Sequence, residues 1–342
     1  MIKKIIIICT TMLILFSLLS IYFVYTSFKP LHAEGVEQFT DFTVGEGESL
    51  YSVLSRLEEK SLIRNSLVYK LYNRFYTPLN VKKGVYKLSP SSGGLEIMRI
   101  LEEGRQELIR VTVPEGLRSS QIAELLEQKG ITDSQEFIAA VNNKALMREL
   151  GLPSDSAEGY LYPDTYYFQK DFPAKQVLAH MVSTFFGSLK NIYPFYEDLS
   201  PEKLQEKIIL ASIVEKEYRV DEEAVLIASV FNNRMKIGMP LQSCATVIYI
   251  ITEIQGKDHP ERIFFRDLEI PSPFNTYIND SLPPGPISNP GRTALNAAFN
   301  PAQSDYLFFV VKDSAAGTHT FTSNLADHNT ARAAYIQGFR SK

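Results

Sequence analysis

The sequence predicts an α+β protein with a single N-terminal transmembrane helix, a region of short βα modules and a C-terminal mixed α+β domain. Two observations lead to this fold class. Ile5–Tyr25 contains 21 residues without a charge, and as a helix it would be about 31 Å long, the thickness of a bilayer core. Beyond it, short strand-like segments alternate with amphipathic helical ones.

The composition restricts the function classes. The chain has 342 residues with 35 basic and 39 acidic side chains, a net charge of −4. Broad nucleic-acid binding depends on a basic surface, so no nucleic-acid partner is expected. Two cysteines and five histidines provide neither a disulfide framework nor a Cys/His metal framework. We therefore expect no metal and no cofactor.

Residues 1–27 are expected to form a cytoplasmic tip and a membrane anchor. Lys3 and Lys4 precede the apolar run and Lys29 follows it, and the leading pair favours an N-terminus in the cytoplasm. This predicts a single-pass protein of the inner (cytoplasmic) membrane, with the remainder of the chain outside the cytoplasm. The alternative is a cleaved signal peptide, but the run is longer than the apolar region of most signals and Leu31–Ala33 is a weak cleavage site.

A weak internal repeat follows a linker expected at residues 28–41. Phe42–Gly47 opens one unit, and Val111–Gly116 opens another 69 positions later. Each unit predicts a short strand, a turn and an amphipathic helix. The first unit resembles a LysM module, a small glycan-binding fold, although a generic βα element explains the same pattern. We assign residues 42–152 to this LysM-like and βα repeat region.

The C-terminal domain is expected to span residues 153–342, because Gly151–Ser156 is a cluster of breaking residues. The next stretch, Glu158–Tyr167, is rich in tyrosine. Aromatic faces with hydroxyls suit the alternating apolar and polar faces of sugar rings. A tyrosine-rich packing loop has the same composition, so both interpretations stay open at this point.

A predicted helix carries the strongest candidate for chemistry. Ser200 is suited to cap it and Pro201 to take its first position. Ile208–Val214 is almost wholly apolar, so the helix is expected to be buried. Glu217 shares the face of positions 210, 213 and 214, whereas Glu215 lies on a smaller, more polar face. Burial raises the pKa of a carboxyl, as a general acid requires near neutral pH. The alternative is a helix end that emerges into water with ordinary solvated charges.

Two later segments are expected to build a groove. Leu241–Val247 is predicted to be extended. Leu282–Ile287 is too rich in glycine and proline for a helix, so it would hold its backbone amides, with Asn275, in fixed directions. His319 and His328 are nine residues apart without a nearby carboxylate or cysteine pattern, which is not a metal-ligand signature.

Seven short motifs occur in order along the C-terminal domain. They are Glu158–Gly159 with Tyr162–Tyr166, Ala211–Glu217, Val230–Phe231 with Asn233–Arg234, Leu241–Gln242 with Thr246–Val247, Asn275–Tyr277, Leu282–Ile287 and Gly317–Phe321. With the N-terminal anchor, they resemble the YceG-like (MltG) family of endolytic murein transglycosylases over nearly the whole chain. Two departures are Cys244–Ala245, where the family often has Asp-Pro, and Tyr218, where a small residue is common.

The resemblance implies a lytic transglycosylase that cleaves the β-1,4 bond between N-acetylmuramic acid and N-acetylglucosamine in nascent peptidoglycan. It would leave 1,6-anhydromuramyl ends and serve cell wall assembly. It places the catalytic acid at the second glutamate of the Glu-Lys-Glu motif, Glu217. The residues expected to contact or orient substrate are Glu158, Tyr166, Glu215, Asn233, Arg234, Gln242, Thr246, Asn275, Tyr277 and His319. Expected partners are glycan strands and peptidoglycan synthases of the elongation machinery.

Two other functions fit the same residues. A hydrolytic muramidase would use the same acid but needs a second carboxylate to activate water, for which Glu158 or Asp164 is the candidate. A non-catalytic, membrane-anchored scaffold would bind glycan through the LysM-like region and would not depend on Glu217.

Overall fold

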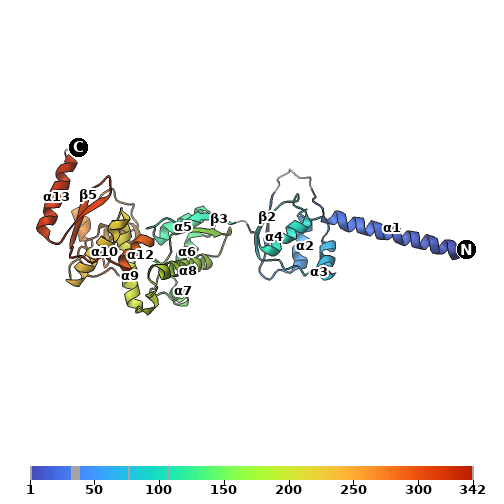
Figure 1. Cartoon of the computed structure of the whole chain (residues 1–342), viewed down its shortest axis with the longest axis horizontal. Coiled ribbons are helices and arrows are strands. Elements are labelled where there is room, and N and C mark those ends of the chain that lie inside the picture. The colour runs from blue at the N-terminus through green and yellow to red at the C-terminus, as the bar shows by residue number, and fades with distance from the viewer. Residues whose placement is uncertain (1, 32–38, 76–77, 107, 341–342) are drawn as a thin grey trace. The chain divides into compact units, whose positions relative to one another are not determined.

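The computed structural model describes residues 2–31, 39–75, 78–106 and 108–340 (Figure 1). The chain forms two compact units, Met1–Ile109 and Arg110–Lys342. Each unit contains helices and strands, so the mixed α and β class is confirmed. The boundary expected between residues 152 and 153 lies inside the second unit.

α1 (Ile2–Phe28) is one continuous helix. Its segment Ile8–Phe28 has the length and hydropathy of a membrane span, and it is the one such helix among the described residues. The chain stays in contact with the first unit just after α1, since the amide of Leu31 donates to the carbonyl of Pro90 at 3.0 Å. Residues 32–38 of the expected linker lie outside the described residues, and the first strand begins at Thr40.

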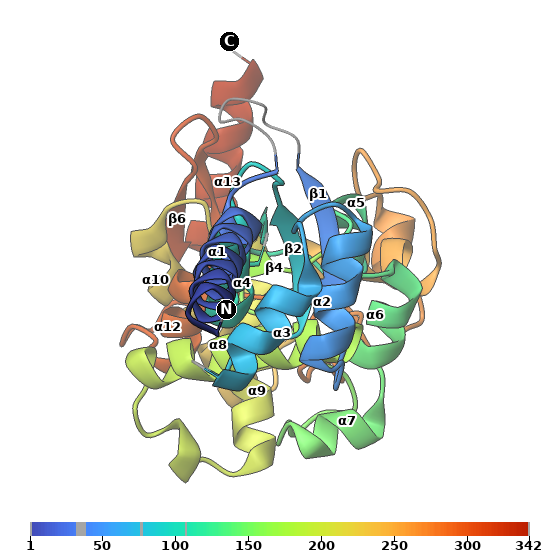
Figure 2. The ribbon, with the colours of Figure 1, turned by 90° about the vertical axis from the view of Figure 1, so that its right-hand side faces the viewer.

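The rest of the first unit is a two-stranded antiparallel sheet with helices packed against it. Phe42 and Tyr86 lie opposite each other in this sheet, and both are fully buried in the core. Figure 2 shows α2 and α3 side by side. Gly104 in the left-handed conformation, with φ 75°, ends the last helix. The elements are β1 (Thr40–Val44), α2 (Leu50–Glu59), α3 (Ser66–Phe75), β2 (Gly84–Leu88) and α4 (Gly94–Glu103).

The second unit opens with the second strand–helix repeat. β3 pairs with β4 in a two-stranded sheet, and the hydroxyls of Thr112 and Thr165 lie 2.9 Å apart across it. Both halves of the predicted repeat are therefore a strand followed by a helix. The elements are β3 (Ile109–Thr112), α5 (Ser119–Gln128), α6 (Ser134–Val141), α7 (Lys144–Glu149), β4 (Thr165–Phe168) and α8 (Ala174–Ile192).

The remaining elements gather around one helix, α9, which packs against α10, α11 and α12. Its residues 208–214 are at most 5% exposed, so the predicted burial is confirmed. A final antiparallel pair of strands and a terminal helix complete the unit. The elements are α9 (Pro201–Glu217), α10 (Asp221–Lys236), α11 (Cys244–Tyr249), a π-helical turn (Ile250–Ile254), α12 (Arg292–Phe299), β5 (Phe308–Asp313), β6 (Thr318–Thr322) and α13 (Leu325–Arg340).

Candidate active site

Glu217 is the last residue of α9, and the ends of this helix explain its position. The hydroxyl of Ser200 accepts a hydrogen bond from the amide of Lys203 at 3.2 Å, and Pro201 is the first helical residue, as predicted. At the other end Tyr218 turns to an extended conformation, with ψ 153°. The buried body of α9 thus fixes a carboxyl at its exit.

Opposing influences act on the pKa of the Glu217 carboxyl. Burial raises its pKa, while a hydrogen bond from Ser243 and the charge of His319 act in the opposite direction. The Ser243 hydroxyl donates to Glu217 Oε1 at 2.5 Å. The carboxyl is therefore less acidic than a solvated glutamate and is held by a specific donor, two properties of a general acid. The alternative of an ordinary solvated helix end is not supported.

Ser243 is itself held by a network from another loop. Its amide donates to Thr276 Oγ1 at 3.0 Å, and the amide of Gln242 donates to the carbonyl of Thr276 at 2.9 Å. The hydroxyls of Thr246 and Thr276 are 2.9 Å apart, and both side chains are buried. Gln242 has a left-handed φ of 56°, a conformation uncommon for a residue with a side chain. This tight turn aims Ser243 at the carboxyl.

The prediction that Leu241–Val247 is extended is wrong in its second half. α11 begins at Cys244, directly after the left-handed turn at Gln242. The Thr246 hydroxyl donates to the carbonyl of Ser243 at 2.8 Å and so stabilises the first turn of the helix. Tertiary contacts to Thr276 override the local pattern here.

Glu217 lines a cavity of about 210 Å³. Arg118 and Lys216 bring two cationic side chains to the same cavity, and Glu217 is the one acidic side chain that lines it among the described residues. Arg118 Nε forms an ion pair with Glu253 at 3.0 Å, whereas Lys216 Nζ donates to the carbonyl of Gly116 at 3.2 Å. The other lining residues are Gly116, Gln121, Cys244, Ala245, Ile248, Tyr249, His259 and Ile287.

Cys244 connects this cavity to a second one. It lines both the Glu217 cavity and a neighbouring cavity of about 380 Å³ that Tyr277 also lines. The Cys244 sulfur and the Tyr277 hydroxyl are 3.0 Å apart. Desolvation raises the pKa of the Cys244 thiol, so the group that pairs with the Tyr277 hydroxyl is neutral. Cys9 and Cys244 are both free thiols.

The glycine- and proline-rich segment Leu282–Ile287 forms part of the wall of the Glu217 cavity, as the sequence predicts. The Ser212 hydroxyl of α9 accepts a hydrogen bond from the amide of Ile287 at 3.0 Å. Ser288 in turn donates from its hydroxyl to the carbonyl of Ser212 at 3.0 Å. These two bonds attach the loop to α9, and Ile287 lines the Glu217 cavity.

Three residues expected to contact substrate instead hold the backbone around the site. Arg234 is 7% exposed and donates to the carbonyls of Leu307 at 2.7 Å and Leu241 at 2.9 Å. The Asn233 amide donates to two carbonyls of the segment before β5. Asn275 is fully buried and its amide donates to two loop carbonyls at 2.9 Å. These donors are engaged by backbone carbonyls, so the three side chains support the backbone around the site.

His319 forms a pair with a residue that the sequence does not single out. His319 Nδ1 lies 2.7 Å from Glu223 Oε2, and the carboxyl also accepts the backbone amide of His319 at 3.0 Å. The His319 side chain is 7% exposed. Glu223 lies 96 residues earlier in the chain, so no local pattern reveals the pair.

Glu158 and Glu215 do not line the Glu217 cavity. Glu158 accepts hydrogen bonds from the amide of Ser119 at 3.0 Å and from Asn289 Nδ2 at 2.8 Å. Glu215 accepts one from the amide of Gly291 at 2.9 Å. Burial raises the pKa of each to about 7. Both carboxyls join distant segments of the unit rather than face the candidate acid.

Tyr166 is placed in the core. It is 3% exposed, stacks on Phe168 with ring centroids 5.6 Å apart, and donates its hydroxyl to the carbonyl of Tyr162 at 2.6 Å. Tyr160 is also fully buried. For these two tyrosines the packing interpretation therefore holds, and a direct sugar contact by Tyr166 is not supported.

Asn289 is a central residue of the second unit that no sequence motif reveals. It is fully buried, and its Oδ1 accepts the amides of Gly159 at 2.8 Å and Leu161 at 2.9 Å. Its Nδ2 donates to Glu158 and to the carbonyl of Leu117. Gly159 must lack a side chain here, because a Cβ would lie 2.5 Å from Pro286 Cγ. The Glu158–Gly159 motif is thus a structural junction.

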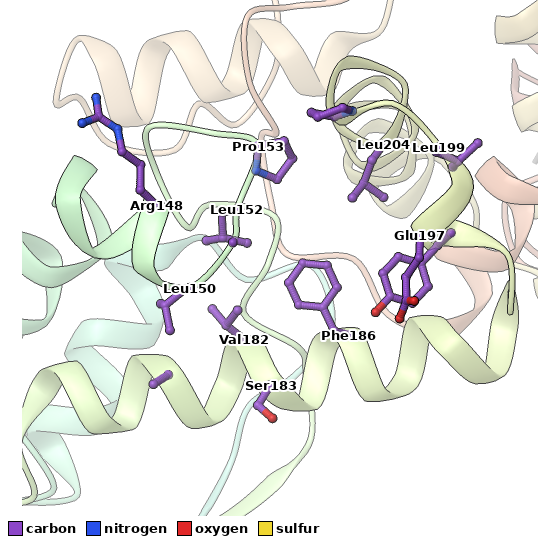
Figure 3. Close-up of a pocket in the computed structure, with 14 residues that line it drawn as sticks. Arg148, Leu150, Leu152, Pro153, Val182, Ser183, Phe186, Glu197, Leu199 and Leu204 are labelled. Atoms are coloured by element: carbon purple, nitrogen blue, oxygen red, sulfur yellow. The ribbon is translucent and has the colours of Figure 1, made fainter.

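A larger cavity lies elsewhere. It holds about 810 Å³ and does not include Glu217. Figure 3 shows Phe186 and Val182 of α8 facing Leu204 of α9 across it. Its walls are mainly aliphatic and aromatic carbon. The carboxyl that lines it, Glu197, is exposed and lies 3.9 Å from Lys190 Nζ. Among the described residues, no group of three His, Cys, Asp or Glu side chains is arranged to hold a metal ion.

Stability is expected to fall as pH rises from about 4.5 to 7. In this window the folded chain keeps protons on Glu158 and Glu215 that the unfolded chain, with carboxyl pKa near 4.5, has lost. Glu158→Gln should make this fall shallower, since one of the two groups no longer titrates. The urea midpoint from pulse proteolysis in mild detergent, at pH 5 and 7.5, measures it. Glu124→Gln, at an exposed position, is the control. The prediction is contradicted if the urea midpoint changes equally between the two pH values in Glu158→Gln and in the wild type.

Comparisons of the sequence and of the structure with known proteins point to the same family. The YceG-like family model matches residues 42–334. An endolytic murein transglycosylase of Bacillus subtilis is 30% identical over 329 residues, which cover 90% of this chain and 89% of that protein. One of Streptococcus pneumoniae D39 is 28% identical over 92% of this chain but only 61% of its own length. The crystal structure of a yceG-like protein from Listeria monocytogenes has 30% identity and a TM-score of 0.57, covering 86% of this chain and 99% of that one.

Proposed function

The chain belongs to the YceG-like family, and from this premise we propose that it is an endolytic peptidoglycan lytic transglycosylase. It would cleave the bond from N-acetylmuramic acid to N-acetylglucosamine in nascent strands during cell wall assembly. One structural observation supports the proposal from residues of this chain. A carboxyl with a raised pKa, Glu217, lines a cavity and is held by a hydroxyl donor.

In the proposed mechanism Glu217 acts twice. Its protonated form donates the proton to the glycosidic oxygen while the bond from that oxygen to the muramyl anomeric carbon breaks. The carboxylate that remains accepts the proton of the muramyl 6-hydroxyl, whose oxygen attacks the same carbon. A 1,6-anhydro ring forms, Glu217 is protonated again and no water is consumed.

The cavity favours this reaction over hydrolysis. A hydrolytic glycosidase commonly needs a second carboxyl, and Glu217 is the one acidic side chain lining its cavity among the described residues. Glu158 is engaged by Ser119 and Asn289. Asp164 accepts the amide of Thr165 at 2.7 Å and does not line the cavity. Neither alternative base is placed to activate water beside Glu217.

We propose that side chains lining the Glu217 cavity contact the substrate. Arg118, Gln121, Lys216 and Tyr249 line it with Glu217, and they offer charged, amide and aromatic groups to a sugar and its substituents. Tyr277 would contact substrate beyond Cys244. Because Arg118 belongs to the compact unit Arg110–Lys342, we propose that the catalytic domain begins near residue 110 rather than 153.

The first unit and α1 are proposed to hold the enzyme at its substrate. The order β1–α2–α3–β2, with antiparallel strands, supports a LysM-like module. The span Ile8–Phe28 with Lys3 and Lys4 before it supports a single-pass anchor with its N-terminus in the cytoplasm. The active site would then meet newly made strands outside the cytoplasm, close to the synthases that make them.

Digestion of purified glycan strands by the full chain in detergent tests the function. We expect strands to be cut internally, so that intermediate lengths accumulate early, and mass spectrometry should find ends that lack one water relative to hydrolysed ends. Hydrated ends would instead support the muramidase. Binding without cleavage would support the scaffold.

Ser243→Ala is expected to move the pH profile of cleavage to higher pH. The Ser243 hydroxyl stabilises the carboxylate form of Glu217, so its loss raises the pKa and keeps the acid protonated at higher pH. The rate of glycan cleavage against pH measures the shift of the high-pH limb. Ser229→Ala, in which a buried serine loses its contact to Ser304, is the control. A limb that stays in place in Ser243→Ala contradicts this role.

A further inference from the structure

α3 carries an apolar stripe that the first unit leaves uncovered. Leu67, Leu71 and Phe75 are four residues apart and therefore lie along one face of the helix. Their exposed fractions are 62%, 50% and 72%. The opposite face is buried, with Tyr69 fully enclosed in the core. A soluble module of this size rarely presents such a stripe to water.

α1 runs beside this stripe. A cavity of about 640 Å³ separates the two helices, and its walls are almost entirely carbon. Phe16, Leu19 and Phe23 line it from α1, and Leu71 and Phe75 line it from α3. Every α1 residue on this wall falls within Ile8–Phe28, the segment with the properties of a membrane span.

The end of α1 is attached to α3 by specific contacts. The ring of Phe28 meets those of Tyr69 and Tyr72 edge-on, with centroids 5.1 and 5.8 Å apart. The Tyr69 hydroxyl donates to the carbonyl of Ser27 at 3.1 Å, and Ser27 is 3% exposed. α3 is therefore held beside the last turns of the span rather than at the end of a free tether.

We propose that α3 lies in the outer leaflet as an interfacial helix and that lipid acyl chains fill the groove between α1 and α3. The inference rests on the proposed anchoring by α1. Lipid is the occupant because the α1 wall of the groove is a face of the span itself, so the groove is continuous with the lipid-facing surface. Basic and aromatic side chains mark the headgroup level: Lys29 Nζ lies 4.6 Å from the centre of the Tyr25 ring, and Lys70 and Arg74 flank the stripe on α3.

The consequence is a fixed orientation of the first unit on the membrane. One helix alone allows rotation about the membrane normal and tilting of whatever follows it. A second apolar helix in the interface restricts the tilt. The LysM-like module would then present the same face to glycan at a constant height above the bilayer.

Single tryptophans in the full chain test the proposal, because the natural sequence contains none. Leu71→Trp reports on α3 and Leu18→Trp, at the middle of the span, reports on anchoring. Glu59→Trp, at an exposed position of α2, is the aqueous control. Each variant is placed in phosphatidylcholine–phosphatidylglycerol vesicles whose acyl chains carry bromine at a shallow or a deep position, and iodide is the quencher in water.

We expect Leu71→Trp to be quenched by brominated lipid, more by shallow than by deep bromine, and to be protected from iodide several-fold relative to Glu59→Trp. Leu18→Trp should be quenched most by deep bromine. If Leu18→Trp behaves so while Leu71→Trp is quenched by iodide and not by lipid, the proposal for α3 is wrong. Protection of Leu71→Trp from both quenchers means that protein, such as a second copy of the chain, covers the stripe, which also overturns it. If Leu18→Trp escapes lipid quenching, the anchoring itself fails.

Discussion

Glu217→Gln is expected to lower the rate of glycan cleavage by about 10²–10⁴-fold, the usual contribution of a general acid. The amide keeps the size of the carboxyl and can still accept the hydrogen bond from Ser243, but it has no proton to donate. Initial rates on purified strands, followed by chromatography of the fragments, measure the loss. The expected defect is in kcat, because the proton is transferred only as the bond breaks.

Glu206→Gln is the matched control for this variant. Glu206 lies on the same helix, is exposed and pairs with Lys203, so we expect the wild-type rate. Retention of full activity by Glu217→Gln would remove Glu217 from the mechanism. Loss of activity together with a lower unfolding midpoint would point to folding, which is why both variants should also be compared by urea denaturation.

Asn289→Ala is expected to cost about 3–5 kcal/mol of the free energy of unfolding. The change removes the acceptor of two buried amides, those of Gly159 and Leu161. It also removes the amide donor to Glu158. Buried donors without a partner cost about 1–3 kcal/mol each, and the small side chain leaves no replacement within the junction.

Pulse proteolysis across a urea series compares Asn289→Ala with Asn191→Ala. Asn191 is exposed on α8 and its amide donates to the carbonyl of Gly187 one turn away, so its loss should change the free energy of unfolding by less than about 0.5 kcal/mol. If the two variants have the same midpoint, Asn289 is not the junction that its hydrogen bonds indicate.

The elements that could be predicted are those set by local chemistry. Ser200 and Pro201 define the start of α9, Gly104 defines the end of α4, and the uncharged run defines α1, because caps, left-handed glycines and long apolar stretches act over a few residues. The face of Glu217 was also predictable, since helical spacing alone puts it with positions 210, 213 and 214. Its raised pKa agrees with that expectation.

The partners of these residues could not be predicted, because they come from distant segments. Ser243 meets Glu217 across 26 positions, and Glu223 meets His319 across 96. Asn233, Arg234 and Asn275 have the polar groups expected of substrate contacts, yet those groups hold backbone carbonyls. Residue type and motif order identify the neighbourhood of a site, whereas burial and hydrogen bonding decide which side chains remain available to substrate.

Cleavage of purified glycan strands in water enriched in oxygen-18 tests the central claim most directly. If Glu217 alone serves as acid and base and the muramyl 6-hydroxyl is the nucleophile, the new muramyl ends carry no label, and Glu217→Gln releases almost none of them. New muramyl ends that carry oxygen-18 at the anomeric carbon would show that water is the nucleophile, and the transglycosylase assignment would be wrong.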